Sequence, residues 1–124
     1  AYRIDDGASG ASIVFASDVE WGQSSLAERQ QFLRFCQHPI PADMLVFDGQ
    51  FRTQNYAQHK GWGHSTLEEA AQVASAAGVD RLVVTHHAPG ADDSALEEAE
   101  VALEKLLPGG RLARQGMQLS VGRA

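Results

Sequence analysis

The sequence lacks several features that would place it among secreted, membrane or nucleic-acid-coating proteins. It has a single cysteine, Cys36, which excludes an internal disulfide and favours a reducing compartment, here expected to be the cytoplasm. Its longest apolar runs, such as 13–16 and 82–84, are far shorter than the ~18 residues of a membrane span. We therefore expect no membrane partner.

Positive charge is also scarce. Ten Lys and Arg face 16 Asp and Glu, for a net charge of −6, and this argues against a surface that grips a long nucleic acid through its phosphates. A small anionic substrate remains compatible, because bound metal ions can supply positive charge that side chains do not. The chain also opens without a methionine or a basic and then apolar leader, so its natural start is expected elsewhere.

What is present indicates an α/β protein. The composition, 44% hydrophobic and 21% charged over 124 residues, suits one globular domain. Short β-branched runs predict buried strands at 12–17, 44–47 and 81–85, with 2–4 as a hairpin partner of the first. Amphipathic helices are predicted at 26–37, 67–77 and about 94–107, with capping boxes at Ser25–Glu28, Ser65–Glu68 and Ser94–Glu97. Residues 49–64 form a long polar loop, and a hairpin of 111–114 with 117–121 closes the chain.

Three of these strands end on a residue that could bind metal or act in catalysis, namely Asp18, Asp48 and His86. In α/β sheets, sites form beyond the carboxyl ends of the strands. Taken alone, Asp18 could simply cap a turn, and His86 could be an ordinary hydrogen-bonded histidine. His86 and His87 should point to opposite faces, so only one is expected to enter a given site.

A fourth candidate, His64, lies between two glycines and the start of a helix. Free amides at a helix N-terminus can meet an anion, and Asp48 could orient the imidazole so that it donates a proton. The alternative is a loop histidine near a cap. In the same loop His59 and Lys60 could contact a phosphate, and Trp62 could stack on a ring, although exposed loop residues and space-filling tryptophans are the commoner outcome.

Four segments together carry a family resemblance: Ala16-Ser17-Asp18, Leu45-Val46-Phe47-Asp48, Gly61-Trp62-Gly63-His64-Ser65-Thr66 and Leu82-Val83-Val84-Thr85-His86-His87. In order and spacing they resemble the C-terminal half of the metallo-β-lactamase superfamily, an αββα sandwich of two sheets with helices outside. The likeness covers essentially the whole of 1–124. The His-Ser-Thr stretch is similar to that of the phosphodiesterase branch, which includes tRNA 3′-processing enzymes and hydrolases of small phosphodiesters.

The resemblance implies specific roles for these residues. Asp18 would bridge two divalent metal ions, zinc or else manganese or iron, and His86 would bind one of them. A hydroxide held between the metals would attack phosphorus, and His64, oriented by Asp48, would protonate the departing oxygen. Ser65, Thr66, Lys60 and Trp62 are the expected substrate contacts.

The family's His-x-His-x-Asp-His motif is absent from this chain. Two ligands cannot satisfy a two-metal site that needs about four donors per metal, so the chain alone is expected to be inactive and to require a complementary N-terminal half that carries the motif. Two rival hypotheses stay open: a hydrolase of thioesters or lactams, which has no need of His64 and Asp48, and a non-catalytic protein-binding remnant.

Three structural expectations follow. Donor atoms of Asp18 and His86 should lie roughly 4–6 Å apart, as two metals would require. His64 should reach the same edge of the sheet. The isolated chain should expose an apolar inner face drawn from Ile13, Phe15, Leu45, Phe47, Leu82 and Val84, and so associate, for example as a homo-oligomer, or stay loosely packed.

Overall fold

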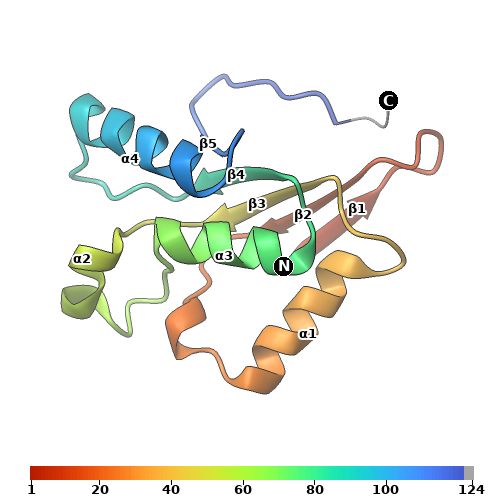
Figure 1. Ribbon diagram of the computed structural model, residues 1–124, viewed down its shortest axis with the longest axis horizontal. Coiled ribbons are helices and arrows are strands. Elements are labelled where there is room, and N and C mark those ends of the chain that lie inside the picture. The colour runs from red at the N-terminus through yellow and green to blue at the C-terminus, as the bar shows by residue number, and fades with distance from the viewer. Residues whose placement is uncertain (122–124) are drawn as a thin grey trace.

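A five-stranded sheet forms the centre of the protein, as seen in a computed structural model that describes residues 1–121 (Figure 1). The strands lie in chain order: β1 (Tyr2–Asp5), β2 (Ser12–Ala16), β3 (Met44–Asp48), β4 (Arg81–Thr85) and β5 (Arg111–Leu112). β1 pairs with β2 antiparallel, and every later pair is parallel. The predicted α/β class and the hairpin partner of the first long strand are confirmed.

Three helices cover one face of this sheet. They are α1 (Leu26–Gln37), α3 (Leu67–Ala77) and α4 (Asp93–Leu106), and they share a side because each crossover returns the chain to the next strand with the same hand. Shorter turns are η1 (Trp21–Gln23), α2 (Thr53–Tyr56) and η2 (Ala57–His59). No helix among residues 1–121 is long and apolar enough to cross a membrane.

The core lies between the sheet and α3. Parallel register sets Val14 beside Leu45 and Leu45 beside Leu82, and these side chains are almost fully buried. Two positions along, Ala16, Phe47 and Val84 repeat the pattern, because side chains two apart on a strand share a face. Alanines and Val73 on α3 complete the cluster, and their small size lets the helix pack close to the strands.

Two helix starts differ from the sequence prediction. α3 is capped by Thr66 and Glu69 rather than by Ser65 and Glu68, because the Ser65 hydroxyl is bonded to the 19–21 loop. α4 is capped by Asp92, whose side chain accepts from the Ala95 amide. The predicted box at Ser25 and Glu28 is confirmed. The caps differ by one residue for α3 and by two for α4, which is the usual uncertainty in assigning helix ends.

The chain's end and its longest loop also differ from expectation. β5 is a two-residue strand parallel to β4, and residues 117–121 form no strand, so the predicted closing hairpin is wrong. Only its turn exists, with the Met117 amide bonded to the Arg114 carbonyl at 3.0 Å. β5 pairs with β4 and becomes the edge strand, because α4 returns the chain to that side of the sheet. The loop 49–64 contains α2 and η2.

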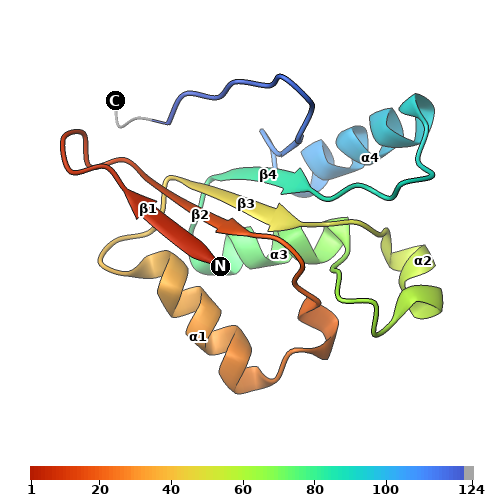
Figure 2. The same cartoon turned by 180° about the vertical axis from the view of Figure 1, so that it is seen from behind.

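The other face of the sheet carries no helix, as Figure 2 shows from behind. Tyr2, Ile4 and Phe15 point there and are 73%, 63% and 41% exposed. Ile13 and Val46 are half-buried, and the residues before Val121 cross the far edge, where Leu119 lines a hollow with Met44 and Val83. The open face is thus apolar at the β1–β2 side.

This arrangement decides which of the six residues predicted for the inner face are exposed. Leu45, Phe47, Leu82 and Val84 pack under the helices, because the strand register assigns them to the side of Val14. Of the six residues named, only Ile13 and Phe15 lie on the open face. Tyr2 and Ile4 join them, since β1 is paired with β2 and the two strands share their alternation.

We predict that Phe15→Lys reduces self-association of the 124-residue chain in sedimentation, because it puts a charge on the exposed apolar face. In a longer protein in which that face is covered, the same change should lower the free energy of unfolding by more than about 2 kcal/mol, since an unpaired charge would be buried. Phe35→Lys is the control, because Phe35 is similarly exposed at 37% but lies on α1. A wild-type chain that is monomeric and melts cooperatively would contradict this prediction.

Candidate active site

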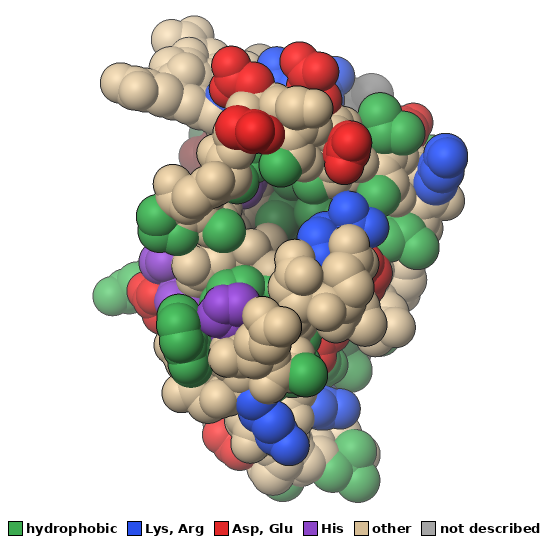
Figure 3. Space-filling view, turned by 90° about the vertical axis from the view of Figure 1, so that its left-hand side faces the viewer, with side chains coloured by type: hydrophobic (Ala, Val, Ile, Leu, Met, Phe, Trp, Pro, Cys, Tyr) green, Lys and Arg blue, Asp and Glu red, His purple; other side chains and the backbone are tan. Residues whose placement is uncertain are grey.

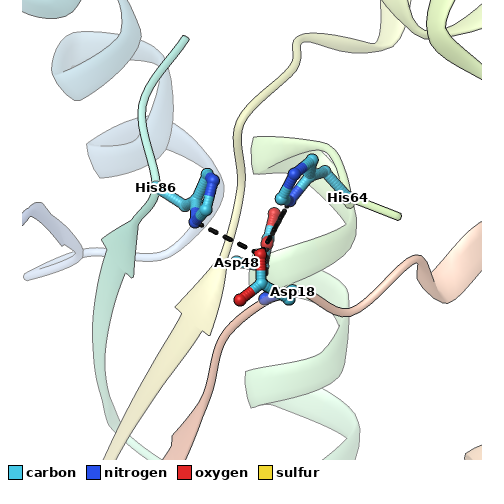
Figure 4. Close-up of side chains that lie close together, drawn as sticks. All are labelled: Asp18, Asp48, His64 and His86. Atoms are coloured by element: carbon cyan, nitrogen blue, oxygen red, sulfur yellow. Dashed lines mark hydrogen bonds and ion pairs between the residues drawn. The ribbon is translucent and has the colours of Figure 1, made fainter. Parts of the chain in front are cut away.

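Four side chains from separate segments meet beyond the carboxyl ends of β2, β3 and β4 (Figure 4). Asp18, Asp48, His64 and His86 each offer one donor atom, and these atoms lie within 4.8 Å of one another. The three strands run parallel, so the residues that follow them share one edge of the sheet. The start of α3 reaches the same edge and brings His64.

Asp18 and His86 are the accessible members of the cluster. Asp18 Oδ1 lies 3.7 Å from His86 Nδ1, and their side chains are 69% and 39% exposed. The expectation that they meet on one face is confirmed, at a distance slightly shorter than predicted. Both are free to take another partner, which is what a ligand position requires.

The backbone at these two positions is unusual. Asp18 has φ 55° and His86 has φ 67°, and among residues 1–121 they are the non-glycine residues with positive φ. This region is sparsely populated by residues with a side chain, although Asp and His tolerate it better than most. Each strand thus turns sharply at its end and aims a polar side chain across the edge. Strain of this kind concentrates at functional sites.

Asp48 has the opposite environment. Its side chain is fully buried, and its oxygens accept from the Asp18 amide at 2.9 Å, the Ser65 amide at 3.1 Å and His64 Nδ1 at 2.7 Å. A buried carboxylate is tolerated only when it is hydrogen-bonded in this way. Asp48 is therefore occupied within the protein, and it joins the loops that follow β2 and β3 to the start of α3.

His64 is oriented by this bond. Its ring is 15% exposed, its Nδ1 faces Asp48 and also lies 3.9 Å from Asp18 Oδ1, and its ring centroid is 4.1 Å from that of His86. With Nδ1 engaged, Nε2 is the ring atom left for another partner. The expectation that His64 reaches the edge that carries Asp18 and His86 is confirmed.

Glu20 is a member of this region that the sequence reasoning missed. Its carboxylate accepts from the Tyr56 hydroxyl at 2.6 Å and from the Gly61 and Gly63 amides at 2.7 and 2.8 Å. Both glycines have φ near +90°, a conformation that glycine adopts without a steric cost. Glu20 therefore ties the loop before His64 to the loop after Asp18. No local sequence pattern predicts these hydrogen bonds, because the partners lie about 40 positions from Glu20.

These bonds also set the acidity of Glu20. Burial by itself would raise its pKa, but the hydrogen bonds from Tyr56 and from the Gly61 and Gly63 amides outweigh that effect, and the pKa of Glu20 lies below its usual range. Glu20 is consequently charged at neutral pH and remains a strong acceptor for the loop.

The four residues expected to contact substrate divide into two pairs. Ser65 and Thr66 are 0% and 2% exposed. The Ser65 hydroxyl bonds Val19 and Trp21, and Thr66 caps α3, so these side chains hold His64 in place. Lys60 and Trp62 are exposed on the loop, and their contact with substrate stays a prediction.

Two other reactive residues lie outside the cluster. His87 turns away from His86, as expected, and its Nε2 lies 2.7 Å from the Ala113 carbonyl. Cys36 is buried on α1, and burial raises the pKa of its thiol to about 11. A thiol of that acidity is almost entirely protonated at neutral pH, so nucleophilic cysteine chemistry is excluded.

The donor chemistry of the cluster suits a divalent metal ion. One accessible carboxylate and one accessible imidazole are donors that zinc, manganese and iron accept. They are two, however, whereas a catalytic zinc site usually has three protein ligands. Asp48 and the Nδ1 of His64 are engaged with each other and add none. The described residues therefore fit part of a metal site.

Comparison with known proteins agrees with this arrangement. Ribonuclease Z of Brevibacillus brevis is 34% identical over 98 residues, which cover 79% of this chain and 27% of that protein. Ribonuclease Z of Parabacteroides distasonis is 37% identical over 64% of the chain, and that of Gemmatimonas aurantiaca is 31% identical over 90%. The chain spans between a quarter and a third of the length of these curated relatives.

A solved structure and a family profile give the same result. The metallo-beta-lactamase fold protein YhfI from Bacillus subtilis superimposes with a TM-score of 0.62 over 93% of this chain and 41% of its own, at 22% identity. That likeness shows the fold. The profile of the beta-lactamase superfamily domain matches residues 1–87, which hold all four clustered side chains. The chain therefore belongs to the beta-lactamase superfamily and has the metallo-β-lactamase fold.

Proposed function

We propose that this chain is the C-terminal half of a metal-dependent phosphodiesterase that cleaves a small nucleotide-like substrate. The observation that carries the proposal is the pairing of two different sub-sites at one edge: the accessible donors Asp18 and His86, and beside them His64 held by the buried Asp48. The similarity to proteins named ribonuclease Z supports a phosphodiester as the class of substrate.

Asp18 and His86 would hold the metal ions, which we propose to be two, of zinc or else of manganese or iron. When bound, such ions would neutralise charge on the phosphoryl oxygens and activate a water molecule. The engaged oxygens of Asp48 leave it a positioning role. Because Asp48 and His64 are bonded to each other, we propose only Asp18 and His86 of the four clustered residues as metal ligands.

His64 would act on the leaving group. Its Nδ1 donates to Asp48, so the proton that can be passed on is held at Nε2, the atom not committed to the protein. A protonated imidazole at that position can give its proton to the departing ester oxygen, which otherwise leaves as an alkoxide. Lys60 and Trp62, exposed beside His64, would meet the phosphate and a ring of the substrate.

The remaining metal ligands would come from a complementary N-terminal half that carries a His-x-His-x-Asp-His motif. Two observations support it. The relatives extend well beyond the matched region, and the face that carries Tyr2, Ile4 and Phe15 is apolar and open. A second sheet packed there would bury that face and complete the site. Without it, we expect the chain to bind zinc weakly and to be inactive. The same face could instead pair two copies of the chain, as the predicted homo-oligomer would require.

Two alternatives remain distinguishable. A hydrolase of thioesters or lactams would keep Asp18 and His86 but would not depend on His64. A protein-binding remnant would depend on none of them. The short bond of His64 to a fully buried carboxylate favours the phosphodiesterase, because among the three hypotheses that one alone assigns the oriented imidazole a chemical role.

We predict that His64→Gln in the full-length protein lowers phosphodiester hydrolysis by about 100-fold or more, because general acid catalysis typically contributes about 10²–10⁴-fold. Rates on a phosphodiester, a thioester and a lactam should be measured in parallel. His38→Gln is the matched control, since His38 is exposed at the end of α1. Thioester or lactam hydrolysis that persists in H64Q while no phosphodiester is cleaved by the wild type would support the rival enzyme.

We further predict that Asp18→Asn and His86→Gln each weaken metal binding by about tenfold or more, since even groups one step removed from a metal are worth about 10–100-fold. H64Q should retain its metal, because His64 is not proposed as a ligand. Elemental analysis of the purified full-length proteins measures both. A wild-type protein without stoichiometric metal would favour the protein-binding remnant.

Glu20→Gln should lower phosphodiesterase activity by roughly 10–100-fold through kcat, because a small displacement of a catalytic group can cost this much. The amide keeps the size of Glu20 but cannot accept on both sides from Tyr56, Gly61 and Gly63. Faster hydrogen exchange at the Gly61 and Gly63 amides should accompany the loss, with metal content unchanged. Glu98→Gln on the exposed side of α4 is the control. Unchanged hydrogen exchange at Gly61 and Gly63 in E20Q would contradict the proposal that Glu20 holds this loop in place.

A further inference from the structure

A cavity of about 220 Å³ lies beside the site, between the α2–η2 segment and α4; we call it the α2–α4 cavity. Figure 3 looks onto this side of the molecule and shows recessed hydrophobic surface between the two helical segments, with acidic side chains along the α4 rim. Its floor is apolar and includes Leu67, Leu96 and Leu112. None of the roles proposed above uses it.

Two flat walls give the α2–α4 cavity its shape. On one side Ala95 and Ala99 lie four residues apart on α4 and so share one face, and Ala91, just before the helix, also lines the cavity. Any larger side chain there would fill the space. On the other side Phe51 stacks on His59, with ring centroids 4.4 Å apart and planes at 14°. The two nearly parallel rings present a flat surface on this side.

The lining also contains an unsatisfied polar group. Gln50 lines the α2–α4 cavity, and its side-chain oxygen Oε1 is buried without a hydrogen-bond partner among the described residues. Buried acceptors are nearly always paired in folded proteins. Arg52 nearby is already committed to Glu68 at 3.1 Å. Oε1 is closed to solvent in this conformation, so a ligand that brings a donor group would supply what Gln50 lacks once the side-chain amide turns toward the cavity.

The cavity is connected to the reacting groups. The Phe51 ring centroid is 6.2 Å from that of His64, and the Gln50 amide donates to Asp48 Oδ1 at 3.4 Å. His87, which follows His86, also lines it. A group joined to the phosphate by a single sugar-sized linker would therefore reach the α2–α4 cavity while the phosphate stays at the site.

We propose that the α2–α4 cavity binds the planar heterocyclic base of the nucleoside next to the cleaved phosphodiester, a proposal that rests on the proposed function. The volume falls below the roughly 300–1,000 Å³ of pockets for drug-sized ligands, which suits one ring system. Flat apolar walls favour a planar ring, and an unpaired acceptor favours one with an amino or imino group. A neighbouring hollow that shares His87 is lined by Asp93 and Glu97, whose charge disfavours a phosphorylated ligand.

The test compares two ligands that differ at one carbon of the sugar, where one carries the base and the other a hydroxyl group. Adenosine 5′-monophosphate and ribose 5-phosphate are titrated calorimetrically into the zinc-loaded full-length protein, and adenosine 3′-monophosphate is included to allow for either orientation. At least one adenosine monophosphate should bind about 10-fold more tightly than ribose 5-phosphate, as base stacking commonly gives. Ala95→Leu, which fills the cavity, should abolish that difference. Ser94→Leu, one position along the same exposed helix turn, should preserve it.

Ribose 5-phosphate affinity serves as an internal control, because it should be the same in the wild type and both variants if the phosphate site and the fold are intact. Equal affinities for adenosine monophosphates and ribose 5-phosphate in the wild type, or a base preference that survives in A95L, would overturn the inference and leave the proposed function standing. If no phosphate compound binds and no phosphodiester is cleaved, the proposed function fails and this inference fails with it.

Discussion

The buried carboxylate of Asp48 organises this end of the molecule. It accepts hydrogen bonds from the Asp18 amide, the Ser65 amide and His64 Nδ1, and it is shielded completely from solvent. If any of these segments moved away, a charge would be left buried with fewer partners, which is among the costlier defects a protein can have. The positions of the loops after β2 and β3 and of the start of α3 are therefore coupled to one another. Glu20 extends the same principle to the loop before His64.

The sheet explains why these groups can meet at all. Strands β2, β3 and β4 are parallel neighbours in chain order, so their carboxyl ends share one edge and their crossovers place every long helix on one face. The left-handed backbone at Asp18 and His86 then turns their two side chains toward each other across this edge. The same layout leaves the opposite face open at Tyr2, Ile4 and Phe15. A parallel sheet is normally covered on both faces, and a complementary half would cover this one while adding the metal ligands that are missing.

The edge of the sheet also has an internal order. His64 and His86 lie on the solvent side of Asp48, and the ring of Phe51 separates His64 from the α2–α4 cavity. Under the proposed function, His64 as proton donor would thus lie between the accessible donors Asp18 and His86 on one side and the α2–α4 cavity on the other. In that proposal the substrate would be recognised on both sides of the cleaved bond, with the Phe51–His59 stack as the boundary between the two.

Local patterns in the sequence were sufficient for most of the strands, for the three long helices and for the four clustered side chains. Hydrophobic runs of strand length and capping residues report on neighbours within four positions, so they predicted β2, β3, β4, the three long helices and the polar residues at the strand ends. They could not decide which face of β3 would be covered, because Leu45 and Val46 are equally apolar. They placed the cap of α3 on Ser65 because its bond to the 19–21 loop is invisible locally. Contacts between distant segments likewise decide the hydrogen bonds of Glu20, the pairing of β5 with β4 and the presence of the α2–α4 cavity. The sequence by itself determined which residues could do chemistry, since that depends on side-chain type and local conformation; the tertiary structure alone decided which of them meet, because only packing brings distant segments within bonding range.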